Sequence, residues 1–172
     1  MMRQFRIQSS LIAVGLLFLL SACGKQETKP PTVSGFRCHT VITCDSLTAE
    51  GELTRETAGM LTLELTQPET LRGMQLRWDG ETATVKLHGL SFGIDPEALP
   101  ASGFGKALLS SLDAATGSVP GAYDDEGRCR TAGHGASGDF TLTSDPETGY
   151  LLSLSIPSLH LTATFSSFEL LT

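Results

Sequence analysis

Apolar and polar residues alternate along most of the chain after its first 35 residues, a pattern typical of β-strands that bury one face. Segments 36–45 and 47–54 are predicted to form a first hairpin. Further along, the dipeptide Asp79-Gly80 separates alternating segments over 74–78 and 83–88. Because this dipeptide is strongly favoured in tight hairpin turns, the two segments are predicted to pair in antiparallel fashion.

The second half of the chain repeats this pattern. A predicted turn over 145–149 has proline at its second position and glycine at its end. It joins a predicted strand over 140–143 to one over 152–156, and a last strand is predicted from 159 to 165. The chain therefore reads as a succession of antiparallel strands.

One segment follows a helical period instead. Phe104, Leu108 and Leu112 recur every four residues, which places them on one face of an α-helix. We predict an amphipathic helix near 102–116, with Ser102 as its N-terminal cap.

These elements predict a mainly β fold, a strongly curved antiparallel sheet or incomplete barrel with one amphipathic helix. A single helix is too small to cover the apolar face of eight or nine strands. Either the sheet curls on itself, or part of that face lines a cavity. The residues predicted to line the core or an apolar cavity are Leu61, Leu63, Leu65, Met74, Leu76, Trp78, Val85, Leu87, Phe104, Leu108, Leu112, Leu152, Leu154, Ile156, Leu161 and Phe165.

The amino terminus has the layout of a secretory signal. Arg3 and Arg6 precede an apolar run over 11–20, and Leu20-Ser21-Ala22-Cys23 follows. This tetrapeptide resembles the lipobox of bacterial lipoproteins. The resemblance implies that residues 1–22 are removed, and that Cys23 carries lipid and anchors the protein to the extracytoplasmic face of the cell membrane. The apolar run is too short to span a bilayer, since ten helical residues cover about 15 Å.

Residues 23–35 contain Pro30-Pro31 and no apolar period, so they are interpreted as a lipidated tether. Residues 36–172 are predicted to form the single folded domain, whose size suits one hydrophobic core.

Three cysteines remain besides Cys23, and their number is odd for an exported domain. Cys38 and Cys44 lie six residues apart in an extended segment, about 20 Å from each other and beyond disulfide reach. A disulfide, if formed, is expected to join Cys129 to either Cys44 or Cys38. No CxxC pair is present, and no metal site is predicted.

The charge balance excludes one class of partner. Without residues 1–22 the chain has 10 basic and 19 acidic residues, a formal charge of −9. Such a charge opposes binding to nucleic acid. The serines lack the turn motif of hydrolase nucleophiles, so no catalytic residue and no cofactor are predicted.

Beyond the lipobox, the order of motifs resembles the superfamily that contains the lipoprotein-localisation carriers LolA and LolB and the mycobacterial LppX-type lipoproteins. The layout also resembles that of lipoproteins of anaerobic Gram-positive bacteria. The motifs are, in chain order, Gly51-Glu52-Leu53-Thr54-Arg55, Gly59-Met60-Leu61, Pro68-Glu69-Thr70-Leu71-Arg72-Gly73-Met74 and Trp78-Asp79-Gly80-Glu81. The resemblance implies an incomplete, curved barrel plugged by helices, with an apolar interior that binds acyl chains or other lipids.

Two hypotheses for function follow. The first is a non-enzymatic, lipid-anchored protein that binds an apolar ligand such as a lipid or an acyl chain. The second is a membrane-tethered interaction or sensory module with a filled core, whose partner is another envelope protein.

Overall fold

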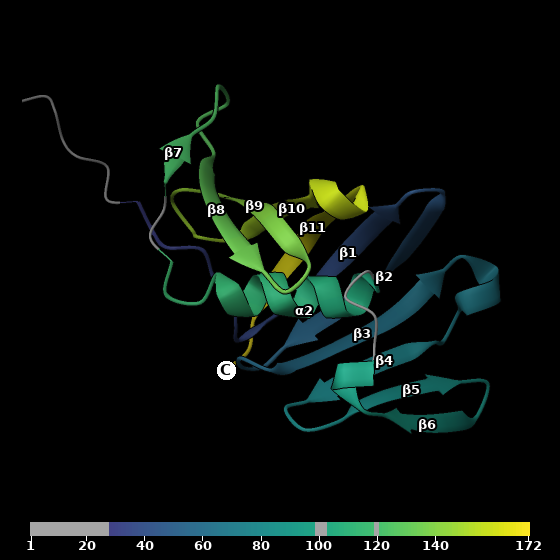
Figure 1. Cartoon of the computed structure of the whole chain (residues 1–172). Coiled ribbons are helices and arrows are strands. Elements are labelled where there is room, and N and C mark those ends of the chain that lie inside the picture. Colours follow the sequence, from purple (N-terminus) through teal and green to yellow (C-terminus); the bar gives the residue numbers. More distant parts are fainter. Residues whose placement is uncertain (1–27, 99–102, 119–120) are drawn as a thin grey trace, which may run out of the picture.

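The computed structural model describes residues 28–98, 103–118 and 121–172 (Figure 1). Cys23 and Ser102 lie outside the described residues, so the predicted lipidation and the predicted helix cap stay predictions. The strands are β1 (Phe36–Cys44), β2 (Leu47–Arg55), β3 (Met60–Gln67), β4 (Gln75–Asp79), β5 (Ala83–Leu87), β6 (Leu90–Ile94), β7 (Ala122–Tyr123), β8 (Cys129–Gly135), β9 (Gly138–Ser144), β10 (Leu151–Ile156) and β11 (Leu161–Leu170). Three short 3-10 helices, η1 (Glu69–Leu71), η2 (Pro96–Ala98) and η3 (Pro157–Leu159), and the α-helix α2 (Phe104–Ala114) complete the described elements.

All described strands belong to one antiparallel sheet with the order β6-β5-β4-β3-β2-β1-β11-β10-β9-β8-β7. Most neighbours in this order are also neighbours in sequence, as expected for a chain of hairpins. The exception lies in the middle, where β1 pairs with β11 and joins the first half of the domain to the last. The strands β6 and β7 lie at the two edges of the sheet, and each pairs with a neighbour on one side only. The sheet is therefore open and not closed into a barrel. The predicted fold class, a mainly β curved antiparallel sheet with one helix, is confirmed.

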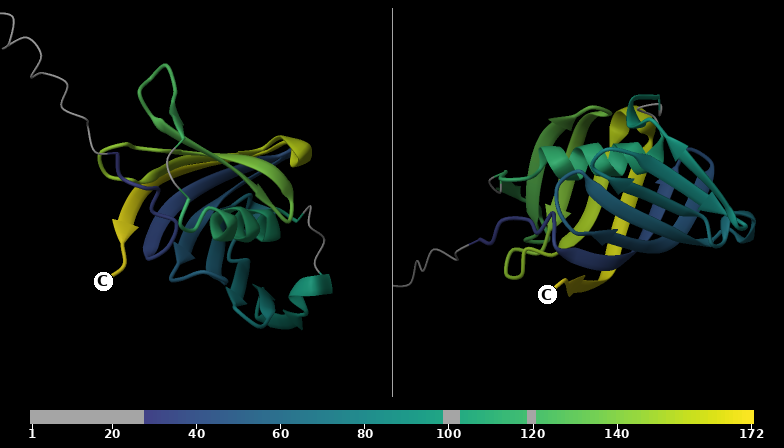
Figure 2. Two further views of the ribbon diagram at one scale, coloured as in Figure 1. Left: turned by 60° about the vertical axis from the view of Figure 1, so that its left-hand side comes forward. Right: turned by 90° about the horizontal axis from the view of Figure 1, so that it is seen from below.

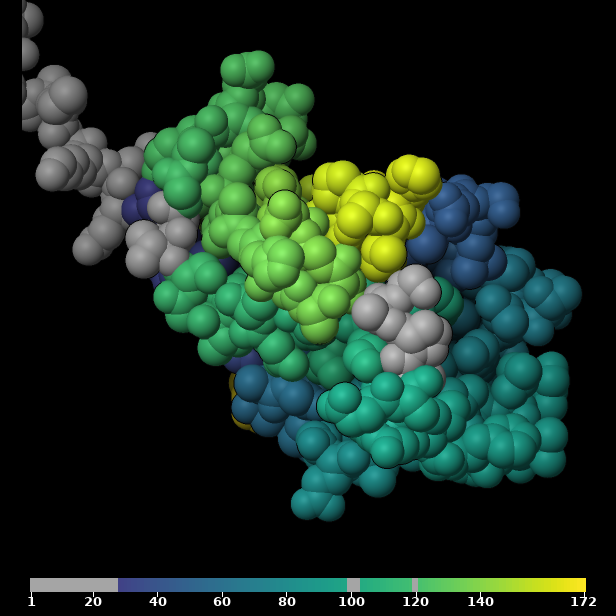
Figure 3. Space-filling model, viewed as in Figure 1, coloured from purple at the N-terminus to yellow at the C-terminus, as the bar shows by residue number. Residues whose placement is uncertain are grey.

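The sheet curves around α2, which lies on its concave side (Figure 2). Inward-facing residues of β1 to β5 and of β9, β10 and β11 form one buried apolar cluster with the helix. Helix α2 packs mainly against β8 and β3, and the β8–β9 hairpin lies directly against it (Figure 3). The helix contributes Leu108 and Leu112, both fully buried, to this cluster. The predicted helical face is therefore confirmed.

Strand β10 differs from the prediction in detail. The alternation placed Leu152 inside, but Leu151 is buried and Leu152 is only partly buried. The cause is a register shift between Leu151 and Ser153 in the pairing with β9. Since side-chain direction has a period of two along a strand, such a bulge exchanges the inward and outward faces. Leu154 and Ile156, beyond the bulge, are buried as predicted.

Residues 28–35 also differ from the prediction. They were expected to form part of a free tether, but they run along the folded domain and make main-chain hydrogen bonds to the turn over 145–149. Val33 is buried within the core cluster. The folded unit therefore includes residues 28–35.

A candidate apolar groove

An apolar cavity of about 230 Å³ lies between β4, β5 and the first turn of α2. It is open to solvent on one side, and we call it the apolar groove. The residues that line it are Met74, Leu76, Trp78, Ala83, Thr84, Val85, Gly103, Phe104, Gly105 and Lys106. Five of these, Met74, Leu76, Trp78, Val85 and Phe104, were predicted from the alternation and the helical period to line a core or a cavity.

The strand register explains why these side chains face one another. Leu76 pairs with Val85, and Val85 pairs with Phe92 on the edge strand β6. Paired residues of antiparallel strands share one face of the sheet, so all three point to the concave side. Leu87 pairs with Leu90 and extends the same face. The apolar surface of the groove therefore continues to the edge of the sheet.

This continuation is left uncovered. Phe92 is 54% exposed and Leu90 is 61% exposed, and Leu87 is only partly buried. We call these three residues the edge patch. Helix α2 stops short of them, because its first residues already lie over β4. A contiguous exposed apolar patch beside a cavity is a common mark of a binding surface.

A glycine controls the depth of the groove. A side chain at Gly105 would place its Cβ 2.4 Å from Cη2 of Trp78. The helix can therefore approach the indole ring only because residue 105 has no side chain. Trp78 is 6% exposed, and its indole Nε1 has no hydrogen-bond partner among the described residues. A buried donor without an acceptor costs about 1–3 kcal/mol.

The other predicted lining residues do not line the groove. Most are packed together in the filled part of the core, and their inward direction agrees with the prediction. These buried residues are Leu61, Leu63, Leu65, Leu108, Leu112, Leu154, Ile156, Leu161 and Phe165. The concave face is therefore filled beneath most of the described strands, and the apolar groove lies over β4 and β5.

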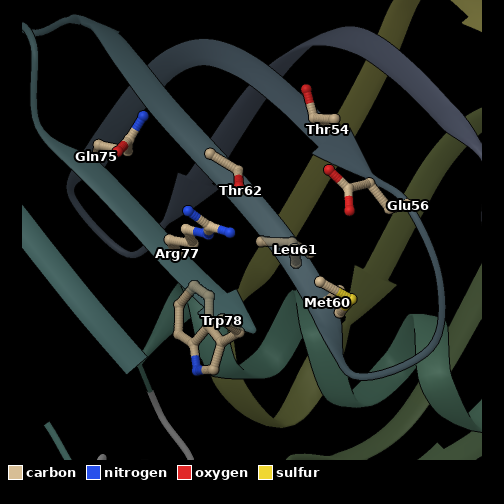
Figure 4. A pocket seen from close by; sticks show the side chains of 8 residues that line it. All are labelled: Thr54, Glu56, Met60, Leu61, Thr62, Gln75, Arg77 and Trp78. Atoms are coloured by element: carbon tan, nitrogen blue, oxygen red, sulfur yellow. The ribbon is translucent and has the colours of Figure 1, made fainter. Parts of the chain in front are cut away.

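A second hollow, of about 210 Å³, has a different character (Figure 4). Thr54, Thr62 and Arg77 are register partners on three neighbouring strands, and they lie on the outer face of the sheet. Glu56 and Gln75 border them. The charged side chains here are exposed, so water screens them and the hollow gives no specific chemistry.

The predicted disulfide is not formed, because Cys38, Cys44 and Cys129 are all free thiols. Three strands, β11, β10 and β9, separate β1 from β8. At about 4.8 Å per strand, the path along the sheet is roughly 19 Å, far beyond the reach of a disulfide. Cys44 instead donates its thiol hydrogen to the carbonyl of Leu159.

The described residues carry little other chemistry. No group of three His, Cys, Asp or Glu side chains within them is arranged to hold a metal ion. In the described part of the chain, every helix is too short or too polar to cross a bilayer.

Comparison with known proteins gives a likeness in fold. No family model matches the sequence, and no curated protein matches it. Among solved structures, the chain is similar to a LolA superfamily protein from Nitrosomonas europaea, with 9% identity and a TM-score of 0.47 over 86% of this chain and 91% of that chain. A conserved protein from Thermus thermophilus gives 10% identity and a TM-score of 0.48 over 81% and 80% of the two chains.

The lipoprotein LppX from Mycobacterium tuberculosis gives 15% identity and a TM-score of 0.37 over 77% of this chain and 85% of that chain. With TM-scores below 0.5 and such low identities, these likenesses imply no ligand for this chain. Arguments about function therefore rest on its own groove.

Proposed function

We propose that this chain is a non-enzymatic, lipid-anchored protein of the cell envelope that binds the acyl chain of an apolar ligand in the apolar groove. Lipid on Cys23 would hold it at the extracytoplasmic face of the membrane. The observation that carries the proposal is an open cavity with an almost wholly apolar lining, continuous with the exposed edge patch.

The size of the groove limits the ligand. Pockets for drug-sized molecules usually measure about 300–1,000 Å³, and this groove measures about 230 Å³. It therefore accepts one stretch of hydrocarbon chain, and the remainder of the ligand would lie along the edge patch. Each buried methylene contributes about 0.8 kcal/mol, so roughly eight methylenes supply an affinity in the micromolar range.

The test uses the intrinsic fluorescence of Trp78, the single tryptophan of the chain. Dibrominated stearic acid is titrated into the protein, since bromine quenches an indole that it contacts. We expect saturable quenching at micromolar concentration. Val85→Glu places a charge inside the groove and is expected to weaken the binding at least tenfold, because a charge is costly to bury there.

Ser91→Glu is the matched control. It adds the same charge beside the groove, but Ser91 pairs with Lys86 on the outer face of the sheet, so binding is expected to remain near that of the wild type. Equal weakening by both substitutions, or the absence of saturable quenching in the wild type, would contradict the proposal. The second hypothesis, a membrane-tethered interaction module with a filled core, would then be favoured.

A further inference from the structure

The segment over 28–35 is fixed to the folded domain by several contacts. Lys29 N–H donates to the carbonyl of Pro146 at 3.1 Å, and Thr32 N–H donates to the carbonyl of Gly149 at 2.8 Å. Thr28 also contacts the hydroxyl of Tyr123 on β7. The two prolines between these donors have no N–H to leave unpaired. The segment is therefore held at one end of the sheet.

Gly149 shows how closely the segment is packed. Its φ is +78°, and a Cβ at this position would lie 2.5 Å from the carbonyl oxygen of Pro30 and 3.2 Å from Oγ1 of Thr32. Any side chain at residue 149 would therefore push the segment away from the turn. The segment over 28–35 and the turn over 145–149 are therefore closely packed and complementary in shape.

The segment ends beside the carboxyl end of α2. Arg55 donates through Nε to the carbonyl of Val33 and through Nη2 to Oδ1 of Asp113, the residue before the last one of the helix. The apolar groove lies at the opposite, amino end of α2, at Phe104 and Gly105. Gly105 and Asp113 are eight residues apart along the helix, so about 12 Å of helix separates the two sites. Figures 1 and 2 agree that the purple segment that precedes β1 and the teal strands β4–β6 lie at opposite ends of the molecule.

We propose that residues 28–35 act as a rigid mount that fixes the orientation of the anchored protein on the lipid bilayer. This inference rests on the proposed lipidation of Cys23. Only residues 24–27 separate Cys23 from the mount, and five extended steps span at most about 18 Å. The end of the sheet formed by β7 and the turn over 145–149 is therefore held close to the bilayer, and the apolar groove lies at the other end of the molecule.

This orientation narrows the source of the ligand. A groove at the end of the molecule away from the anchoring bilayer is held out of reach of the leaflet beneath it. The ligand must then enter the groove from the side of the molecule that faces away from the membrane. The mount thus adds to the proposed function the side from which the ligand enters the groove.

The experiment measures the height of two sites above a bilayer. A chain beginning at Cys23 and carrying Cys44→Ser is coupled through Cys23 to a maleimide phospholipid in phosphatidylcholine vesicles, so anchoring does not depend on cellular lipidation. Cys38 and Cys129 are buried and are not expected to react. Energy transfer to dansyl headgroups is recorded from Trp78 and, in the Trp78→Phe, Glu147→Trp variant, from residue 147, whose side chain is exposed in the turn over 145–149. We expect at least twofold more efficient transfer from residue 147. If Trp78→Phe does not fold, the added transfer of the single Glu147→Trp variant gives the same comparison.

Two glycine substitutions distinguish the loss of the mount from the general effect of replacing a glycine that has a positive φ. Gly149→Ala should release the segment and bring the two transfer efficiencies together, because the anchored domain can then rotate freely. Gly73→Ala is the matched control, since Gly73 has nearly the same φ, +77°, but nothing within 4 Å of its Cβ position. It should keep the twofold difference. Equal transfer from both positions in the parent protein, or greater transfer from Trp78, would overturn the mount. Quenching by dibrominated stearic acid in solution tests the groove separately.

Discussion

Arg55 is a buried charge on the apolar face of β2, and it connects three parts of the chain. Its side chain is fully buried, and Nη2 lies 2.5 Å from Oδ1 of Asp113 on α2. Asp113 also accepts the N–H of Gly59, and Arg55 Nε reaches the carbonyl of Val33. Burial makes this pair sensitive to the loss of either partner, because a charge left alone inside a protein is expensive.

Asp113→Asn is therefore expected to destabilise the protein strongly. The substitution preserves the size and an oxygen acceptor for Gly59, but it leaves the Arg55 guanidinium uncompensated. Loss of one partner of a buried pair costs about 3–5 kcal/mol, and the lower end applies because Asp113 is 34% exposed. Denaturant unfolding followed by circular dichroism measures the change. A loss below about 1 kcal/mol would mean that water, not Asp113, solvates the guanidinium.

At the scale of the element, carboxylates at the start of the hairpin turns hold the strands in register. Asp79 accepts N–H bonds from Glu81 and Thr82 after β4, and Asp145 accepts those of Glu147 and Thr148 after β9. The backbone N–H of Thr82 is the largest cause that lowers the pKa of Asp79, and that of Thr148 is the largest cause for Asp145. Both turns are thus stabilised by the ionised form.

Acid should weaken these turns. Since the pKa of Asp145 is lower in the folded protein than in the unfolded chain, the unfolded chain binds more protons at mildly acidic pH. The stabilisation is complete above the unfolded pKa of about 3.9, and it is lost as pH falls through the lowered, folded value. Asp145→Asn should reduce the fall in unfolding free energy between pH 5 and pH 3. Parallel pH curves for the variant and the wild type would contradict this role.

At the scale of the whole molecule, the sheet is most protected at its centre. Cys38 lies on β1, between β2 and β11, and burial, followed by repulsion from Glu52, raises the pKa of its thiol to about 12. Cys44, by contrast, lies at the end of β1 and is only partly buried. The two thiols lie on one strand but should therefore become accessible through different motions, Cys44 through fraying of the strand end and Cys38 through global unfolding.

Alkylation with iodoacetamide at pH 8 should separate these openings. Cys44 is expected to react through fraying of the strand end, at a rate nearly independent of low denaturant. Cys38 should react only through global unfolding, with a rate that rises as the unfolding free energy falls. Peptide mapping by mass spectrometry assigns each thiol. Similar rates for the two thiols would show that β1 opens as one unit.

The sequence predicted the strands and the helix wherever apolar residues alternate or recur with a clear period. It did not predict β8, whose inward residues include Cys129, Thr131 and Gly133 and so give little apolar signal. It also placed Leu152 inward, because a bulge leaves no mark in the alternation. An alternating pattern predicts a regular strand, and bulges such as the one in β10 depend on the pairing with neighbouring strands.

The candidate site was predicted in part. Met74, Leu76, Trp78, Val85 and Phe104 were recognised as inward-facing, but nothing in the pattern distinguishes a residue that lines an open groove from one in a filled core. That distinction depends on where α2 ends relative to the edge of the sheet. The role of Arg55 was not predicted either, although the sequence held a signal for it. Arg55 lies two residues after Leu53 and therefore on the same apolar face of β2, where a charged residue is unusual.

The pairing of β1 with β11 has a consequence for biosynthesis. The central ladder of the sheet joins Phe36 to Leu170, so its two halves are the first and last strands to leave the ribosome. A nascent chain that lacks residues 161–170 has no partner for one side of β1 and cannot close the core. Such long-range pairing also folds slowly once the chain is complete. The core is thus expected to stay open until synthesis is complete, and a chain without a closed core can still be threaded through a narrow translocation pore.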